Sequence, residues 1–133
     1  LTDIENSLNK LDDDFDTTVI KDAVEFRSRT EYEIYLRKRQ QAADAIQQAM
    51  LGGIPKDFGE AIENLESARS AALLAVTAVN EAYKIILGLP TTNYLTTAIK
   101  ETYKDSSASE RDNIQSALNN LDDQIKIVRD ASA

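Results

Sequence analysis

The clearest pattern in the chain is a stripe of mostly apolar residues between positions 57 and 87, spaced alternately by four and three. This spacing is typical of a helix face that packs along its whole length against other helices. Asp57 precedes the stripe as a possible N-cap, and Gly88, Leu89 and Pro90 follow it as a helix stop. The sequence therefore predicts a helix over 57–87, with the stripe Phe58, Ile62, Leu65, Arg69, Ala72, Val76, Val79, Tyr83 and Ile86.

This predicted helix has two further features. A second stripe of small residues recurs every seventh position, at Ala61, Ala68, Ala75 and Ala82, where a neighbouring helix could approach closely. The middle of the predicted helix is apolar on nearly all sides, which is typical of a helix at the centre of a bundle. Arg69 interrupts the apolar stripe, either as a buried ion-pair partner or as a side chain that extends to solvent.

Similar stripes predict the helices on either side. The apolar positions from Ile114 to Val128 indicate a helix over 108–131, begun by a capping box at Ser107 and Glu110. A shorter helix is expected before it and ends at Asp105-Ser106-Ser107, although the two could instead form one kinked helix. In the first half of the chain, another stripe ends at Gly52-Gly53, and Thr30 and Glu33 match a capping box. This stripe consists of Tyr32, Leu36, Ala43, Ile46 and Met50.

Together these patterns predict an all-α protein. We expect an antiparallel, up-down bundle of four to five helices in a single domain over residues 1–133. The pattern leaves open whether 19–29 continues into 31–51. The expected helices cover residues 3–15, 19–29, 31–51, 57–87, 93–104 and 108–131.

Composition supports this fold class and excludes several kinds of chemistry. With only 4 Gly and 2 Pro, the chain lacks the frequent turns of an all-β fold. It has no Cys and no His, which removes thiol nucleophiles, thiolate metal sites and the commonest general base. The net charge of −8 repels phosphate backbones and argues against a nucleic-acid partner. The apolar run from Ala71 to Val79 is too short for a transmembrane segment.

Two acidic clusters are the candidates for a metal site, and both lack part of the required pattern. Asp12, Asp14 and Asp16 occupy the first, third and fifth positions of a calcium-binding loop, but Thr17 replaces its Gly and Ala23 its bidentate Glu. Glu60, Glu63 and Glu66 lack the His residues of carboxylate-bridged metal sites in helix bundles, and their place in the first turns of a helix explains them. The sequence therefore predicts no metal site and no cofactor.

No arrangement of residues predicts catalysis. The Ser and Thr residues have neither a His nor a Gly-x-Ser-x-Gly context that would activate them as nucleophiles. Gly52-Gly53 lacks the rest of any phosphate-binding loop. We therefore expect that the protein is not an enzyme.

The most informative surface is a basic, Tyr-containing segment that follows an acidic one. Residues 1–26 are predominantly acidic, whereas residues 27–56 are predominantly basic. Tyr and Arg are enriched at protein interfaces because each combines a large contact area with directional hydrogen bonds. The alternative is that these side chains pair within the chain, with Glu31, Glu33 and the acidic N-terminal helix. The candidate partner-binding residues are Arg27, Arg29, Tyr32, Tyr35, Arg37, Lys38 and Arg39.

These observations favour a non-catalytic interaction module that docks on a larger protein assembly. An alternative is a carrier or sensor bundle that binds an apolar ligand around Leu73, Leu74, Val76 and Val79. A start at Leu1 without Met suits a chain whose leader was removed, in an extracytoplasmic compartment or an organelle lumen, or an excised fragment. By analogy of fold class alone, acidic Cys-free bundles include extrinsic lumenal subunits of photosystem II, of the PsbQ type, and periplasmic sensor domains; no residue motif here selects either.

Overall fold

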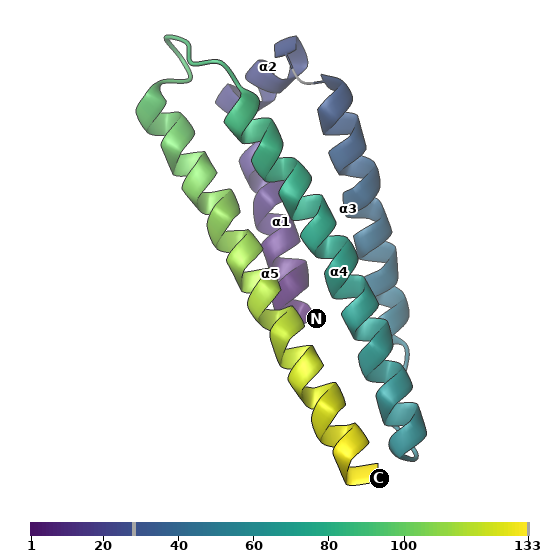
Figure 1. Cartoon of the computed structure of the whole chain (residues 1–133). Coiled ribbons are helices and arrows are strands. Elements are labelled where there is room, and N and C mark those ends of the chain that lie inside the picture. Colours follow the sequence, from purple (N-terminus) through teal and green to yellow (C-terminus); the bar gives the residue numbers. More distant parts are fainter. Residues whose placement is uncertain (28, 133) are drawn as a thin grey trace.

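The fold is organised around one long central helix, α4 (Phe58–Gly88), as the sequence predicts. In the computed structural model, which describes residues 1–27 and 29–132 and not the side chains of residues 18, 19 and 25–27, α4 packs along α3 (Arg29–Met50) on one side and α5 (Thr97–Ser132) on the other. A shorter helix, α1 (Thr2–Asp16), packs chiefly against α5. The short helix α2 (Thr18–Arg27) joins α1 to α3 across one end of the bundle (Figure 1).

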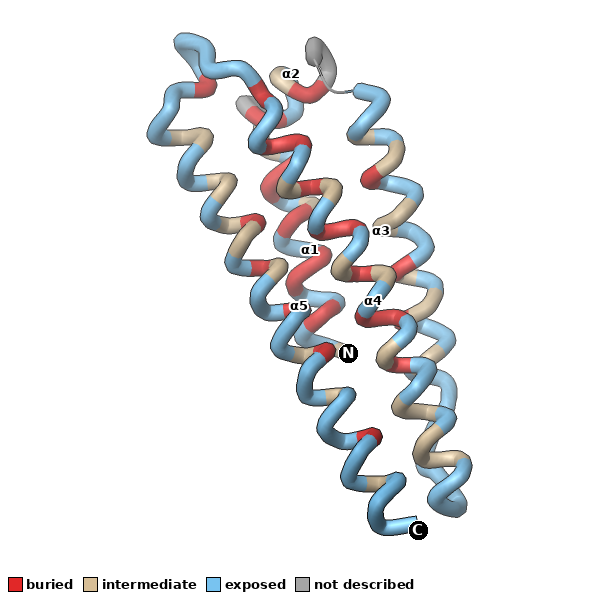
Figure 2. Tube along the Cα trace, in the orientation of Figure 1, coloured by how far each residue is buried: buried red, intermediate tan, exposed pale blue. Residues whose placement is uncertain are grey.

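The helices α1, α3, α4 and α5 alternate in direction, so the expected antiparallel, all-α bundle is confirmed (Figure 1). The described chain contains five helices, and 19–51 comprises two of them, α2 and α3, instead of one long helix. The small-residue stripe of α4 lies in the core: Ala75 and Ala82 are fully buried and Ala68 nearly so. Buried side chains gather toward the end that holds α2 and become sparse toward the other end (Figure 2).

The two ends of α4 are set by different residues. Asp57 is the N-cap, as expected, and its side chain accepts a hydrogen bond of 2.8 Å from the Glu60 backbone N–H. At the other end Gly88 still belongs to the helix, and Leu89 leaves it with φ −69° and ψ 132°. A residue before proline is disfavoured in the helical region, so the stop comes from Leu89-Pro90 and not from a left-handed glycine at 88. In the preceding turn, by contrast, Gly53 has a positive φ of 64°.

Of the two alternatives for 93–104 and 108–131, the separate helices are wrong, because α5 is one continuous helix. Thr92 does not begin it; its hydroxyl accepts hydrogen bonds from the N–H groups of Tyr94 and Leu95 in a compact turn that buries Leu95. Ser106 and Ser107 do not interrupt it either. The Ser106 hydroxyl donates to Asp14 of α1, and the Ser107 hydroxyl donates to the Lys104 carbonyl one turn back. Both polar side chains are thus satisfied without breaking the helix.

The stripe predicted for α3 is displaced by one position in its first half. Tyr35, Ala42 and Ile46 are the buried residues of α3, whereas Leu36 and Met50 are exposed. The reason is the position of α1, which folds back against the start of α3 and covers the side that Tyr35 occupies. This displacement determines which of the aromatic side chains of α3 are buried and which remain accessible to solvent.

By length and composition, α4 is the one helix among the described residues that could cross a membrane, and 44% of that stretch is buried within the bundle. The central helix of a packed bundle has the same composition. Its burial between α3 and α5 accounts for its apolar character.

Candidate functional site

The candidate site is built where the end of α1 meets the start of α3. The rings of Phe15 and Tyr32 lie 5.2 Å apart between centroids, those of Phe15 and Tyr35 5.0 Å, and those of Tyr32 and Tyr35 6.0 Å. These separations and tilted arrangements are favourable for aromatic pairs. The turn through α2 allows this cluster to form, because it brings the end of α1 back alongside α3.

Tyr35 is the internal member of this aromatic cluster. Its side chain is fully buried, and its hydroxyl donates a 2.9 Å hydrogen bond to Asp12. Asp12 also accepts from Arg39 at 2.9 Å, so α1 and α3 are joined by a Tyr35–Asp12–Arg39 network. Burial, together with the charge of Asp12 and this hydrogen bond, raises the pKa of Tyr35 well above its usual value. A buried side chain offers a partner no surface, so Tyr35 is a core residue in this structure.

The predicted basic residues separate into paired and exposed ones. Lys38 forms a 2.9 Å ion pair with Glu81 of α4, and Arg39 is held by Asp12, so both cross-link helices within the bundle. The Arg39 pair is the pairing with the N-terminal helix that the sequence left as an alternative, whereas the Lys38 pair with α4 was not foreseen. Arg29 is largely exposed and lies 3.6 Å from Glu33 on its own helix, and Arg37 is exposed. The side chain of Arg27 lies outside the described residues.

Beside Tyr32 there is a hollow of about 620 Å³ that opens to solvent. Its floor is aromatic and aliphatic, because Phe15, Tyr32 and Leu36 contribute to it, and Leu36 is 42% exposed. Partial burial and the nearby carboxylates of Asp16 and Asp12 raise the pKa of Tyr32, which keeps its hydroxyl neutral. We call this hollow the Tyr32 groove; its lining residues are Phe15, Asp16, Lys21, Val24, Arg29, Tyr32, Glu33 and Leu36.

Two carboxylates of the acidic cluster in α1, Asp12 and Asp14, are engaged by other side chains of the bundle. Asp12 is engaged by Tyr35 and Arg39, and Asp14 accepts a 2.8 Å hydrogen bond from Ser106. Among the described residues, no group of three or more acidic side chains is placed to hold a metal ion. Arg69 extends from the edge of the apolar stripe and forms an ion pair with Asp122 of α5, so it links two helices while staying partly exposed.

No protein-family model matches the chain, and neither a curated protein nor a solved structure matches it.

The sequence pattern selected part of the lining of the Tyr32 groove. It selected Arg29 and Tyr32, which line the groove, and missed Phe15 and Leu36. Leu36 was assigned to the core stripe of the helix expected over 31–51. The available signal was the acidic cluster around Phe15, whose opposite charge favours contact with the basic start of α3.

Proposed function

We propose that the protein is a non-catalytic helical bundle that binds a protein partner through the Tyr32 groove. The observation that carries this proposal is the partly exposed Tyr32 ring, which rests on Phe15 and lines an apolar hollow with Leu36. Rigid aromatic side chains beside a pocket are typical anchors of protein interfaces, because they bury a large area with little loss of conformational freedom.

The Tyr32 groove has a polar rim, and it therefore fits a protein segment better than a purely apolar surface would fit one. Arg29 and Glu33 pair on the α3 side, while Lys21 and Asp16 lie on the α2 and α1 side. A polar rim around an apolar floor is the usual anatomy of a non-obligate interface. We therefore expect a partner segment that inserts one apolar or aromatic side chain and contacts the rim with polar groups.

The packing of Tyr35, Asp12 and Arg39 supports this role. A binding surface loses less affinity to side-chain ordering when its supporting residues are already fixed. The Tyr35–Asp12–Arg39 network fixes α1 against α3 beside the partly exposed ring of Tyr32. The groove is therefore preorganised by the core of the bundle.

The apolar-ligand alternative has less support. In the middle of α4, Val79 is fully buried against its neighbours and Leu73 is 41% exposed to solvent. Neither residue lines a described hollow. An extrinsic subunit of a larger assembly, as the fold-class analogy suggests, would be one form of the proposed interaction module.

The chain offers a closely matched pair of variants for a test. Leu36 lines the groove and is 42% exposed, whereas Leu73 lies on α4 outside it and is 41% exposed. Leu36→Asp and Leu73→Asp therefore make the same chemical change at the same exposure. Affinity capture from the native source should recover a protein that wild type and Leu73→Asp retain and that Leu36→Asp and Tyr32→Ala lose.

Circular dichroism should show the same helix content for all four proteins. If Leu36→Asp and Tyr32→Ala retain the same captured proteins as wild type, the Tyr32 groove is not the binding surface. If Leu73→Asp loses them as well, the effect belongs to the whole bundle, and the proposal for this site fails.

A further inference from the structure

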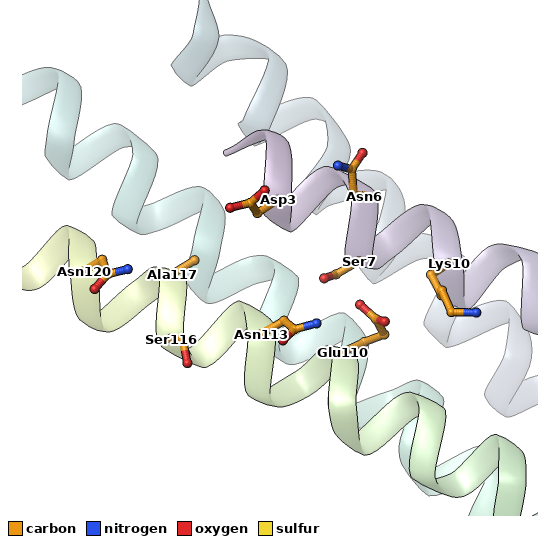
Figure 3. A pocket seen from close by; sticks show the side chains of 9 residues that line it. All are labelled: Asp3, Asn6, Ser7, Lys10, Glu110, Asn113, Ser116, Ala117 and Asn120. Atoms are coloured by element: carbon orange, nitrogen blue, oxygen red, sulfur yellow. The ribbon is translucent and has the colours of Figure 1, made fainter.

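A second hollow, of about 510 Å³, lies between α1 and α5 and is lined almost entirely by polar side chains (Figure 3). On α1 the carboxyl group of Asp3 and the hydroxyl group of Ser7 face it, and on α5 Glu110 points across toward Ser7 (Figure 3). Asn113 and Asn120 add amide groups from α5. We call this hollow the Glu110 groove.

The unusual residue in this groove is Glu110 itself. Its exposed fraction is 9%, yet it forms no hydrogen bond and no ion pair with any residue that the structure describes. No fully buried polar atom of the described side chains lacks a partner, so the Glu110 oxygens meet solvent through the groove. Because Glu110 is largely buried and has no cation beside it, a bound cation would gain an ion pair there.

The other buried polar residues make this contrast specific. Among the residues whose side chains the structure describes, four polar or charged ones are buried: Ser7, Asp14, Ser107 and Glu110. Asp14 receives the Ser106 hydroxyl, and Ser107 donates to its own helix, so both are satisfied internally. The remaining two, Ser7 and Glu110, have no hydrogen bond within the described chain, and both face the same groove. The two buried polar residues without a hydrogen bond in the described chain therefore lie at one place, where their polar atoms reach solvent through the groove.

We propose that the Glu110 groove binds the guanidinium group of an Arg side chain on a protein partner, with Glu110 as its counter-ion. A guanidinium presents several N–H donors in a planar fork, and the groove offers several acceptors: the Glu110 carboxylate, the Ser7 hydroxyl and the amide oxygen of Asn113. It is also more weakly hydrated than an ammonium group, which suits a largely buried carboxylate. This site is separate from the Tyr32 groove and does not depend on it.

Lys10 is the one cation that lines the described groove, and it sharpens the proposal. In the structure its side chain points along α1, away from Glu110, and forms no ion pair with a described residue (Figure 3). It lies close enough in sequence to Ser7 to compete with an incoming guanidinium. Removing its charge should therefore tighten binding of a cationic probe.

The test uses two neutral-ended probes, N-acetyl-arginine methylamide and its citrulline counterpart, which has almost the same shape without the charge. Titrations followed by two-dimensional NMR of the full chain should show shifts at Ser7, Asn113 and Asn120 with the arginine probe. Glu110→Gln should weaken that binding by about tenfold or more, and Lys10→Met should strengthen it a few-fold. Asp130→Asn is the matched control, because it removes one negative charge from the same helix, 20 residues further along.

Several results would overturn the proposal. Equal effects of Glu110→Gln and Asp130→Asn would indicate general attraction to an acidic protein. Equal binding of the citrulline or a capped lysine probe would exclude guanidinium recognition. Leu36→Asp should leave arginine binding unchanged, which separates failure here from failure of the Tyr32 groove.

Thermal unfolding without the probe distinguishes a binding role from a structural one. If Glu110 is an unpaired carboxylate held for a ligand, Glu110→Gln should leave the Tm unchanged or raise it, because the buried charge is removed. A clear fall in Tm would mean that Glu110 stabilises the bundle through contacts of its own. That result would overturn its assignment as a counter-ion for a partner.

Discussion

At the α2 end of the bundle, α1 and α2 cover the long helices with buried side chains such as Leu8, Leu11 and Phe15. At the opposite end, which we call the hairpin end, the α3–α4 turn and the end of α5 lie without α1 beside them (Figure 1). With 15 residues against the 31 of α4, α1 reaches along only about half of that helix. Leu51, Ile54 and Phe58 at the hairpin end are more than half exposed.

The two ends also differ in how their polar groups are used. At the α2 end, Asp12 and Asp14 are engaged by groups from α3 and α5, so polar side chains fix the packing of several helices. At the hairpin end, α4 and α5 are joined by the exposed pairs Arg69–Asp122 and Glu66–Arg129. Exposed ion pairs contribute little to stability. The comparison predicts that stability, and the rigidity that the Tyr32 groove needs, come from the α2 end.

The largest effect should follow from truncating the core of α1. Leu11→Ala removes a fully buried side chain and should lower the free energy of unfolding by roughly 2–5 kcal/mol. Ile62→Ala at the hairpin end removes a partly exposed one and should cost about 1 kcal/mol. Urea unfolding followed by circular dichroism measures both. Equal losses would show that the two ends contribute equally to stability.

Breaking the polar network beneath the groove should have the next largest effect. Asp12→Ala leaves the buried Tyr35 hydroxyl and Arg39 without their acceptor and should cost about 1–3 kcal/mol. Asp13→Ala is the control, because it removes the neighbouring, exposed carboxylate. It should change the free energy of unfolding by less than about 0.5 kcal/mol. A similar loss in both variants would mean that the hydrogen bonds of the network contribute no stability beyond the effect of removing one negative charge.

Alkaline pH should weaken the α2 end through Tyr35. Its pKa is raised in the folded state, so above about pH 10 the unfolded chain loses the phenol proton while the native chain keeps it. Stability should then fall by about 1.4 kcal/mol per pH unit from this residue, and the contribution is fully present below pH 10. Urea unfolding between pH 9 and 11.5 should show a shallower decline for Tyr35→Phe than for wild type. Identical slopes would exclude this linkage.

The sequence predicts those parts of the fold that depend on interactions between residues close together in the chain. Helix α4 was placed within one residue at each end, because Asp57 and Leu89-Pro90 act on their own helix. The break expected in α5 at Ser107 was wrong because the serines are satisfied by Asp14, a residue far away in the chain, and by the helix itself. No local pattern contains that contact.

The same distinction explains the candidate sites. The Tyr32 groove was partly predicted, since Tyr32 and Arg29 belong to a segment whose composition stands out. Tyr35 has the same residue type and nearly the same position, yet it is buried, because α1 covers its side of α3. The Glu110 groove was not predicted at all. Glu110 matched a capping box, and its burial without a partner depends on how α1 lies against α5.

The smallest effect should come from the ion pairs at the hairpin end. Side chains of Arg69 and Asp122 are 41% and 45% exposed, so a double-mutant cycle with Arg69→Met and Asp122→Asn should give a coupling of at most about 1 kcal/mol. Raising the salt concentration to 1 M should reduce it further, because exposed charges are screened. The matching cycle for Arg39 and Asp12, where Arg39 is 17% exposed, should give a larger coupling that salt changes less. A hairpin-end coupling as large as that one would reverse the comparison, because it would place a substantial share of the bundle's stability where α1 does not reach.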